Sequence, residues 1–454
     1  MKLDLAVARN HPASREAFVI FWLGVSSGLP ILLVFGTLSI WLREAGIERA
    51  TIGFLSWAGL SYGFKFVWAP LVDSLQLPGP LGSMGQRRSW MLLSQLGVMV
   101  ALVWMSLWDP SGGGSSLLLL ALGAVALGFS SATQDIAIDA FRIDFASADH
   151  QPLLAGTAVA GYRVGMLLAG AGLLEITGLF EEEGSYNPLA WSIGYLSMAG
   201  LMLVGVVTTL LVREPDVQRP LVQHQLRDNL RLFAHFLMVV AVFVLLFIAL
   251  ADLPGWIPGS GLFIGFFESS LRLVLAVLGA LYSGRLLNRA GLLPQQRFDD
   301  VYVAPFHDFF VRYGKWALAF ILVICTYRIA DIVMGVMAKV FYTDMGYSKE
   351  MIGRISFGFG LVVTISGGIL GGLLALRWGL MRVFLLGAVL AALSNLVFVW
   401  VAGLDQPSNW ALLAAIVVDN LSGGLAGAAA VAFLSSLVNR NFSATQYAAF
   451  TSIT

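Results

Sequence analysis

The sequence predicts an all-α polytopic membrane protein made of two six-helix bundles, with two extra transmembrane helices inserted between them. Three observations carry this prediction. Of the 454 residues, 58% are hydrophobic and only 12% are charged, whereas about a quarter of the residues of a soluble domain are charged. Apolar stretches of about 20 residues, enough to cross a bilayer, follow one another along the chain. A segment near residue 50 recurs near residue 350.

This composition excludes several classes of function. Soluble enzymes and nucleic-acid-binding proteins carry far more charge than this chain. Basic and acidic residues both number 27, so no net charge attracts a polyanion such as nucleic acid. The single cysteine, Cys325, cannot form an internal disulfide, and the five histidines lack the spacing of a metal site. We therefore expect no cofactor, no metal and no enzymatic activity.

The apolar stretches give the expected spans in order. Six spans form an N-terminal bundle within residues 1–215: 18–42, 51–75, 89–108, 116–140, 152–180 and 189–212. A linker, 216–312, holds the inserted pair at 233–251 and 262–283. Four spans form a C-terminal bundle within 313–454: 315–340, 349–375, 380–401 and 409–438. A last apolar segment begins at Ser443 and stops in mid-pattern, so we expect this bundle to be truncated.

Basic residues indicate the orientation. Lys2, Arg9 and Arg15 precede the first span, and no signal-peptide cleavage site follows them. If this end is cytoplasmic, most basic loop residues fall on the cytoplasmic side, as the positive-inside rule requires. The opposite loops carry three consecutive glutamates, 181–183, and several tryptophans typical of a membrane interface. We expect a multi-pass protein with a cytoplasmic N-terminus.

An internal repeat supports the two-bundle organisation. Residues 43–60 resemble 343–361, and four identities share one offset of 300: Gly46, Ile52, Gly53 and Ser56 recur as Gly346, Ile352, Gly353 and Ser356. Glycine and serine are common in membrane helices, so short matches also arise by chance. In both copies, however, the segment joins the first two spans of its bundle. Parallel halves with a site between them are typical of the major facilitator fold.

Two features predict gating elements. In the loop after the second span, Asp73 can cap a neighbouring helix or pair with Arg87 or Arg88, which would close the cytoplasmic side. Because the loop between Asp73 and the arginines is long, the sequence does not decide whether they pair. Alternatively, the two arginines only set the orientation of the chain in the membrane. In the first span, Gly28 and Pro30 are expected to break or bend the helix.

Acidic residues inside the expected spans are candidates for proton coupling. A charge at mid-bilayer is costly, so such residues face the bundle interior. In the fourth span, Asp135 and Asp139 are four residues apart and share one helical face. Two buried carboxylates so placed favour binding of a proton, so we predict that they carry the coupling proton. Alternatively, Asp139 only pairs with Arg142 and ends the helix.

Basic residues inside the spans are the expected ligands for substrate charge. Lys65 lies too deep in the second span to reach the interface comfortably. Arg163 either neutralises Asp135 or binds an anionic substrate group. Arg328 either pairs with Asp331, three residues later, or exchanges that partner for a substrate carboxylate.

Several segments resemble the AmpG-type muropeptide permeases of the major facilitator superfamily. The residues that carry the resemblance are 26–47, 51–73, the GQRRSW of 85–90, the SATQDIAIDAFR of 131–142, 161–166, 213–215 and 441–446. The acetyl-CoA transporter branch is similar in the fourth of these. The resemblance implies proton-driven uptake of N-acetylglucosaminyl-1,6-anhydro-N-acetylmuramyl peptides across a bacterial inner membrane during peptidoglycan recycling. The implied partners are the muropeptide, protons and the lipid bilayer, for a monomeric protein.

A muropeptide site would need aromatic rings for the sugars, bases for carboxylates and an acid for an amine. Besides the charges above, the expected binding residues are polar or aromatic neighbours: Tyr62, Gln134, Tyr162, Tyr327, Asp419 and Asn420. Two alternatives remain open. One is a carrier of acetyl-CoA or another anion, and the other is a membrane assembly scaffold that uses the same fold without transport.

Overall fold

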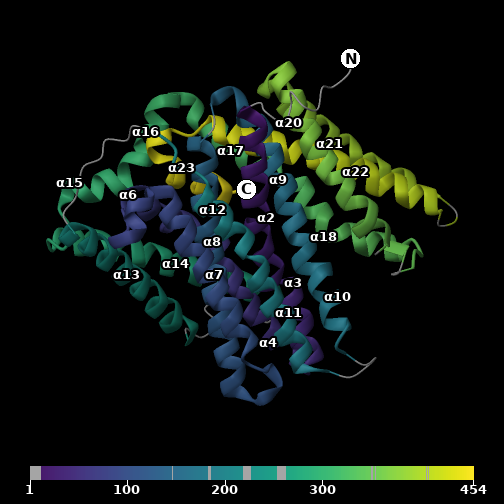
Figure 1. The fold of residues 1–454 in the computed structure, drawn as a ribbon, viewed down its shortest axis with the longest axis horizontal. Helices are drawn as coiled ribbons and strands as arrows, with labels where there is room; N and C mark the ends of the chain where they lie inside the picture. The colour runs from purple at the N-terminus through teal and green to yellow at the C-terminus, as the bar shows by residue number, and fades with distance from the viewer. Residues whose placement is uncertain are drawn as a thin grey trace. The chain divides into compact units, whose positions relative to one another are not determined.

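The computed structural model describes residues 12–145, 147–181, 186–217, 226–252, 262–348, 351–352, 354–404, 406 and 408–454. Every regular element within these ranges is a helix (Figure 1). Eleven helical segments of the described chain are long and apolar enough to cross a membrane. The protein is therefore an all-helical, multi-pass membrane protein, as its composition predicted.

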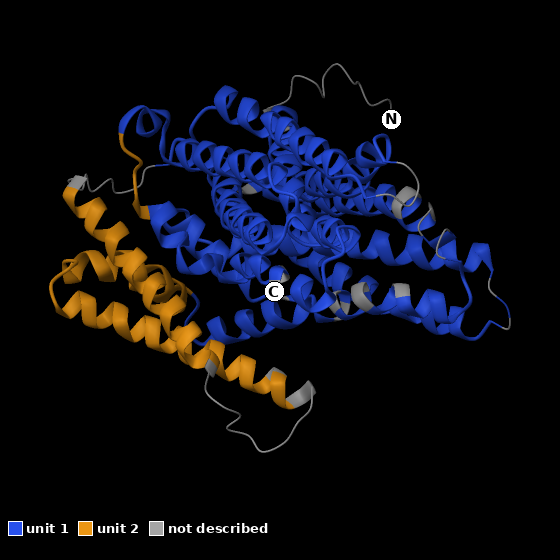
Figure 2. Cartoon of the chain, turned by 90° about the horizontal axis from the view of Figure 1, so that it is seen from below, with its two compact units in different colours: residues 1–73, 79–217, 313–454 blue, residues 74–78, 218–312 orange. Residues whose placement is uncertain are grey.

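The chain forms two compact units (Figure 2). Unit 1 comprises residues 1–73, 79–217 and 313–454, and unit 2 comprises 74–78 and 218–312. The helices of unit 2 are α13 (Leu226–Ala249), α14 (Leu262–Arg289), α15 (Gln295–Phe298) and most of α16 (Ala304–Tyr313). Unit 1 carries the candidate site.

The N-terminal helices of unit 1 are α2 (Pro12–Val34), α3 (Gly36–Glu44), α4 (Arg49–Leu55), α5 (Leu60–Phe64), α6 (Ala69–Ser74), α7 (Gln86–Ser106), α8 (Gly114–Phe145), α9 (Gln151–Leu167), α10 (Leu173–Gly178), α11 (Pro188–Leu201) and α12 (Leu203–Leu211). Its C-terminal helices are α17 (Ala317–Tyr327), α18 (Ile329–Asp344), α20 (Leu361–Trp378), α21 (Leu380–Ala402), α22 (Asn409–Ser436) and α23 (Ser443–Ser452). In the first group α2 packs against α9, and in the second α20 packs against α22.

The second expected span is not one continuous helix. Residues 51–75 form α4, α5 and α6, separated by 3-10 turns at Ser56–Gly59 and Lys65–Val67. Pro70 contributes no N–H to an intrahelical bond, and Trp68 two residues before it has φ −107° and ψ −5°. Proline and the surrounding glycines therefore interrupt this span, and the interruption places Lys65 in a 3-10 turn inside the protein.

Gly28 and Pro30 were expected to break or bend the first span, and the prediction of a break there was wrong. Helix α2 runs through both residues to Val34, and the interruption lies at Phe35, with φ −107° and ψ −86°. Gly28 instead permits close packing, because a Cβ there would lie 2.0 Å from the Tyr162 carbonyl oxygen of α9. Gly161 and Gly165 of α9 meet the α2 backbone in the same way.

Substituting Gly28 with alanine should separate α2 from α9 and destabilise the protein by about 1–3 kcal/mol, as overpacking does. Thermal unfolding in detergent measures the change. Gly63→Ala is the matched control, since no atom lies within 4 Å of a Cβ built there. Equal unfolding temperatures for the two variants would contradict the close contact at Gly28.

Glycine contacts also join the N-terminal and C-terminal helices. A Cβ on Gly156 of α9 would lie 2.5 Å from the Gly368 carbonyl oxygen of α20. A Cβ on Gly372 of α20 would lie 2.8 Å from the Pro152 carbonyl oxygen of α9. The two backbones therefore touch directly at this crossing.

The two copies of the internal repeat share the turn that follows α3 and α18. Gly46 has φ 82° and Gly346 has φ 84°. The Gly46 N–H donates to the Arg43 carbonyl and the Gly346 N–H to the Thr343 carbonyl. The next residue in each copy bonds five residues back. This is a Schellman motif, in which glycine is favoured because the left-handed backbone has no Cβ to clash.

Candidate functional site

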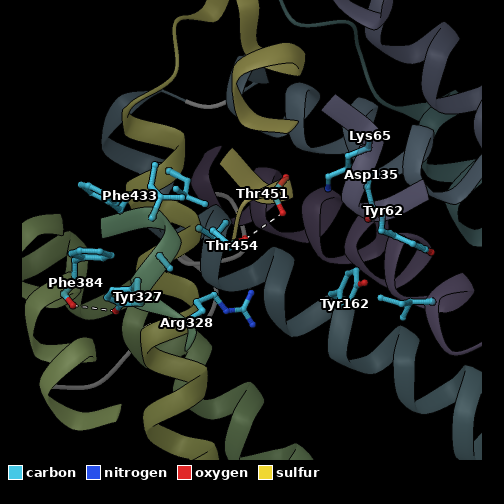
Figure 3. Close-up of a pocket in the computed structure, with 16 residues that line it drawn as sticks. Tyr62, Lys65, Asp135, Tyr162, Tyr327, Arg328, Phe384, Phe433, Thr451 and Thr454 are labelled. Carbon is cyan, nitrogen blue, oxygen red and sulfur yellow. Dashed lines mark hydrogen bonds between the residues drawn. The ribbon is translucent and has the colours of Figure 1, made fainter. Parts of the chain in front are cut away.

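A cavity of about 310 Å³ lies between the N-terminal and C-terminal helices of unit 1 (Figure 3). Its lining includes six of the residues predicted from the sequence: Tyr62, Lys65, Asp135, Tyr162, Tyr327 and Arg328. Figure 3 shows the first four on one wall and the last two on the other. Charged residues from distant parts of the chain therefore converge on one space.

The N-terminal wall is polar and tightly hydrogen-bonded. Asp135 of α8 is 7% exposed and accepts a hydrogen bond from the Ser27 hydroxyl of α2. Lys65 is also 7% exposed, and its ammonium is the positive charge that interacts with Asp135. The Tyr62 hydroxyl donates to Ser131 Oγ at 2.7 Å. This wall holds a buried acid and a buried base that face the same space.

The C-terminal wall is aromatic with one cation. Tyr327 stacks on Phe384 with ring centroids 4.3 Å apart, and Phe384 stacks on Phe433 at 4.3 Å. Arg328 lies at the break between α17 and α18 and extends toward Tyr162 (Figure 3). Phe384 and Phe433 were not predicted, because a phenylalanine within an apolar span gives no signal of its own.

Arg163 does not neutralise Asp135. The electrostatic partners of Arg163 are Arg328, Tyr162 and Asp331. The cation that interacts with Asp135 is Lys65. Arg328 and Asp331 interact electrostatically, but the ion pairs of the described residues do not include this pair. The guanidinium of Arg328 is left facing the cavity.

Five predicted binding residues do not line the cavity: Gln134, Arg163, Asp331, Asp419 and Asn420. Asn420 instead joins two helices, since its Oδ1 accepts from Thr364 Oγ1 at 2.7 Å and its Nδ2 donates to its own helix. Asp419 interacts electrostatically with Asp331. Gln134 is fully buried and donates to Ser26 Oγ of α2 at 3.1 Å.

A first polar contact between the two groups of helices, here called the Arg87 seam, comprises Asp73, Arg87, Asp144, Ser443 and Thr445. The Arg87 guanidinium contacts Asp73 at 2.6 Å and Asp144 at 2.8 Å, and donates to Ser443 Oγ of α23 at 2.7 Å. Asp73 also accepts from the Thr445 N–H at 2.7 Å, which caps the N-terminus of α23. The long loop therefore does not prevent the Asp73–Arg87 pairing.

A second contact, the Arg142 seam, comprises Asp139, Arg142, Ser435 and Tyr447. Arg142 is fully buried, pairs with Asp139 at 3.3 Å and donates to Ser435 Oγ of α22 at 3.0 Å. Its guanidinium lies 5.3 Å from the centre of the Tyr447 ring of α23. Asp139 thus pairs with Arg142, which was the alternative to its role as a proton carrier.

Arg88 does not join the two groups of helices. Its guanidinium donates to the carbonyls of Thr209 at 3.1 Å and Leu210 at 2.9 Å, at the end of α12. The Glu214 carboxylate accepts the backbone N–H groups of Arg87 and Arg88 and caps α7. Arg88 therefore holds the N-terminal helices together.

Comparisons with known proteins agree with this architecture. A sequence model of the Major Facilitator Superfamily matches residues 20–454. A Rickettsia felis protein named AmpG 4 is 30% identical over 96% of this chain and 85% of its own. The anhydromuropeptide permease of Escherichia coli K12 is 29% identical over 95% of this chain and 69% of its own.

Solved structures show the same fold. The proton:xylose symporter XylE matches with a TM-score of 0.61 at 10% identity, covering 97% of this chain and 85% of its own. The transporter FucP, in its outward conformation, matches with a TM-score of 0.56 at 11% identity, covering 98% and 89%. With its helical spans, its repeat and its central cavity, this chain belongs to the major facilitator superfamily and, within it, to the AmpG-type permeases.

Proposed function

We propose that this transporter is a proton-coupled symporter that imports N-acetylglucosaminyl-1,6-anhydro-N-acetylmuramyl peptides into the cytoplasm for peptidoglycan recycling. It does so by alternating access in a bacterial inner membrane, with its N-terminus in the cytoplasm. The name of the Escherichia coli relative supports the substrate. The orientation is supported by the basic residues at the N-terminus and in the loops on that side.

The observation that carries the proposal is that one cavity has a polar, charged wall and an opposite wall of aromatic rings with one cation. The stacked rings of Tyr327, Phe384 and Phe433 offer an apolar surface for the sugar and lactyl groups. The Lys65 and Arg328 cations, on opposite walls, are suited to the carboxylates of the peptide. A neutral sugar would need no such cations, and a purely anionic ligand would need no aromatic wall.

Asp135 is the proposed proton carrier. It is buried beside Lys65, so the charge state of one affects the other. Protonation of Asp135 releases Lys65 from its counter-ion and leaves the ammonium free for a substrate carboxylate. Proton binding and substrate binding then favour each other, which is the linkage a symporter needs.

The cavity size fits part of the substrate. Small-molecule sites range from about 300 to 1,000 Å³, and 310 Å³ lies at the lower end. We infer that the cavity holds the anhydromuramyl and neighbouring groups, and that the rest of the substrate extends toward the open end. With both arginine seams on the cytoplasmic side closed, that end faces the periplasm.

The test is uptake of labelled anhydromuropeptide into proteoliposomes with an imposed proton gradient. The Asp135→Asn protein should lose uptake by ~5–150-fold, the range of a coupling free energy of about 1–3 kcal/mol. Its gradient-independent exchange should persist. Asp149→Asn, at an exposed position, is the matched control. Uptake that changes neither with an uncoupler nor in Asp135→Asn would reject the coupling. If acetyl-CoA competes for uptake and unlabelled muropeptide does not, the proposed substrate is wrong.

A further inference from the structure

Behind the cavity, a second group of polar side chains is buried among the N-terminal helices. Ser26 of α2, Gln95 of α7 and Gln134 of α8 are each fully buried. Gln134 donates to Ser26 Oγ at 3.1 Å, and Ser26 lies 3.5 Å from the sulfur of Met202. These residues play no part in the cavity, whose lining does not include them.

Three amide atoms of this cluster have no protein partner within the described chain. They are both side-chain polar atoms of Gln95 and the Oε1 of Gln134. Leaving a buried polar group without a hydrogen bond costs about 1–3 kcal/mol. Because buried polar groups are normally satisfied by protein or ordered water, three such atoms close together indicate a ligand.

Gly205 of α12 shows where these side chains converge. A Cβ built on Gly205 would lie 2.1 Å from Ser26 Oγ and 3.1 Å from Gln95 Nε2. Both polar atoms therefore approach the same point from different helices. The Ser26 hydroxyl therefore packs directly against Gly205, with the Gln95 amide close by, and a Cβ at Gly205 would displace that hydroxyl.

We propose that Ser26, Gln95 and Gln134 form a binding site for ordered water inside the N-terminal helices. A water molecule both donates and accepts, and a buried one typically makes about three hydrogen bonds. The unpartnered atoms supply two amide oxygens, which accept, and one NH₂ group, which donates, so they match that capacity. The cluster carries no charge, so a neutral ligand fits it better than an ion does.

The site adjoins the proposed proton carrier. Ser26 precedes Ser27, which donates to Asp135, and Gln134 precedes Asp135. Water bound here would hold α2 and α8 in the register that directs the Ser27 hydroxyl at Asp135. This consequence rests on the proposed function, whereas the presence of water does not.

Hydroxyl-radical footprinting by X-ray radiolysis tests the site, because radicals form from water next to buried side chains. Met202 and Met105 are both fully buried in one apolar core, but only Met202 contacts the Ser26 hydroxyl. Met202 should be oxidised several-fold faster than Met105 in the wild-type protein. Equal rates would overturn the proposal. The measurement needs no transport, so its failure leaves the symport test unaffected.

Two variants sharpen the test. Gly205→Ala places a methyl group against the Ser26 hydroxyl, so it should displace that hydroxyl from the site. Met202 oxidation should then fall to the rate of Met105, whereas an unchanged rate would place the water elsewhere and overturn the site. Gln95→Leu removes two polar atoms. If they have no water partner, its unfolding temperature should rise, because two unsatisfied groups are gone. An unchanged or lower unfolding temperature supports the water site.

Discussion

Replacing Arg87 with methionine should open the Arg87 seam. Arg87 is 1% exposed, and the side chains of its partners Asp73 and Asp144 are 4% and 0% exposed. Removing the cation leaves two buried carboxylates without a counter-charge, a change that typically costs about 3–5 kcal/mol. Both ion pairs lie within the N-terminal helices, and contact with α23 adds to the burial of the two carboxylates. Because opening the seam would hydrate them, the closed state should lose up to ~100-fold in population relative to the open one.

The opening can be followed by thiol labelling. Ala448 of α23 is 2% exposed, and Ala448→Cys in a Cys325→Ser background gives one reporter near the seam. A membrane-impermeant maleimide should label it slowly with Arg87 present and rapidly in Arg87→Met. Arg88→Met is the matched control, because Arg88 contacts only the N-terminal helices. Equal labelling of the two variants would show that Arg87 does not hold the seam.

A second large effect is expected from Asp139→Asn. Arg142 is fully buried and cannot lose its proton in a protein, so it depends on Asp139 as counter-ion. A hydrogen bond to a charged group contributes about 1.5–3 kcal/mol. Because the Asp139 side chain is 27% exposed, the loss should lie toward the lower value and increase labelling of the same reporter roughly tenfold.

The double variant Asp139→Asn with Arg142→Leu tests whether the unpaired Arg142 is the cause of the faster labelling. If the unpaired guanidinium opens the seam, removing it should return labelling to the slow rate of the parent. If labelling stays fast, Asp139 acts in some other way than through Arg142. Ser435→Ala removes only the neutral partner of Arg142 and should change labelling far less than Asp139→Asn.

Much of the site was predictable because a charge within an apolar stretch stands out. Lys65, Asp135 and Arg328 were identified in this way, and the structure brings them to one cavity. Their partners were not predictable. Lys65 rather than Arg163 faces Asp135, since the choice depends on how α5, α8 and α9 turn about their axes. One-dimensional spacing contains no such information.

The fold class was predictable, and the interruptions of the spans were less so. The second break within residues 51–75, at Lys65–Val67, follows from Pro70, whose effect the apolar length of the segment concealed. At Gly28 the sequence indicated a break or bend, whereas in the structure the lack of a side chain lets α2 pack closely against α9. A glycine serves either purpose, and only the neighbouring helix decides between them.

The bare backbone crossing of α9 and α20 has a consequence for the speed of transport. At Gly156 and Gly368 the contact is mainly backbone against backbone, so these helices can part with little rearrangement of side chains. The activation barrier for exchanging the two access states then comes mainly from the guanidinium groups and the water they must recruit. Turnover should accordingly respond more to changes at Arg87 and Arg142 than to conservative changes in apolar packing.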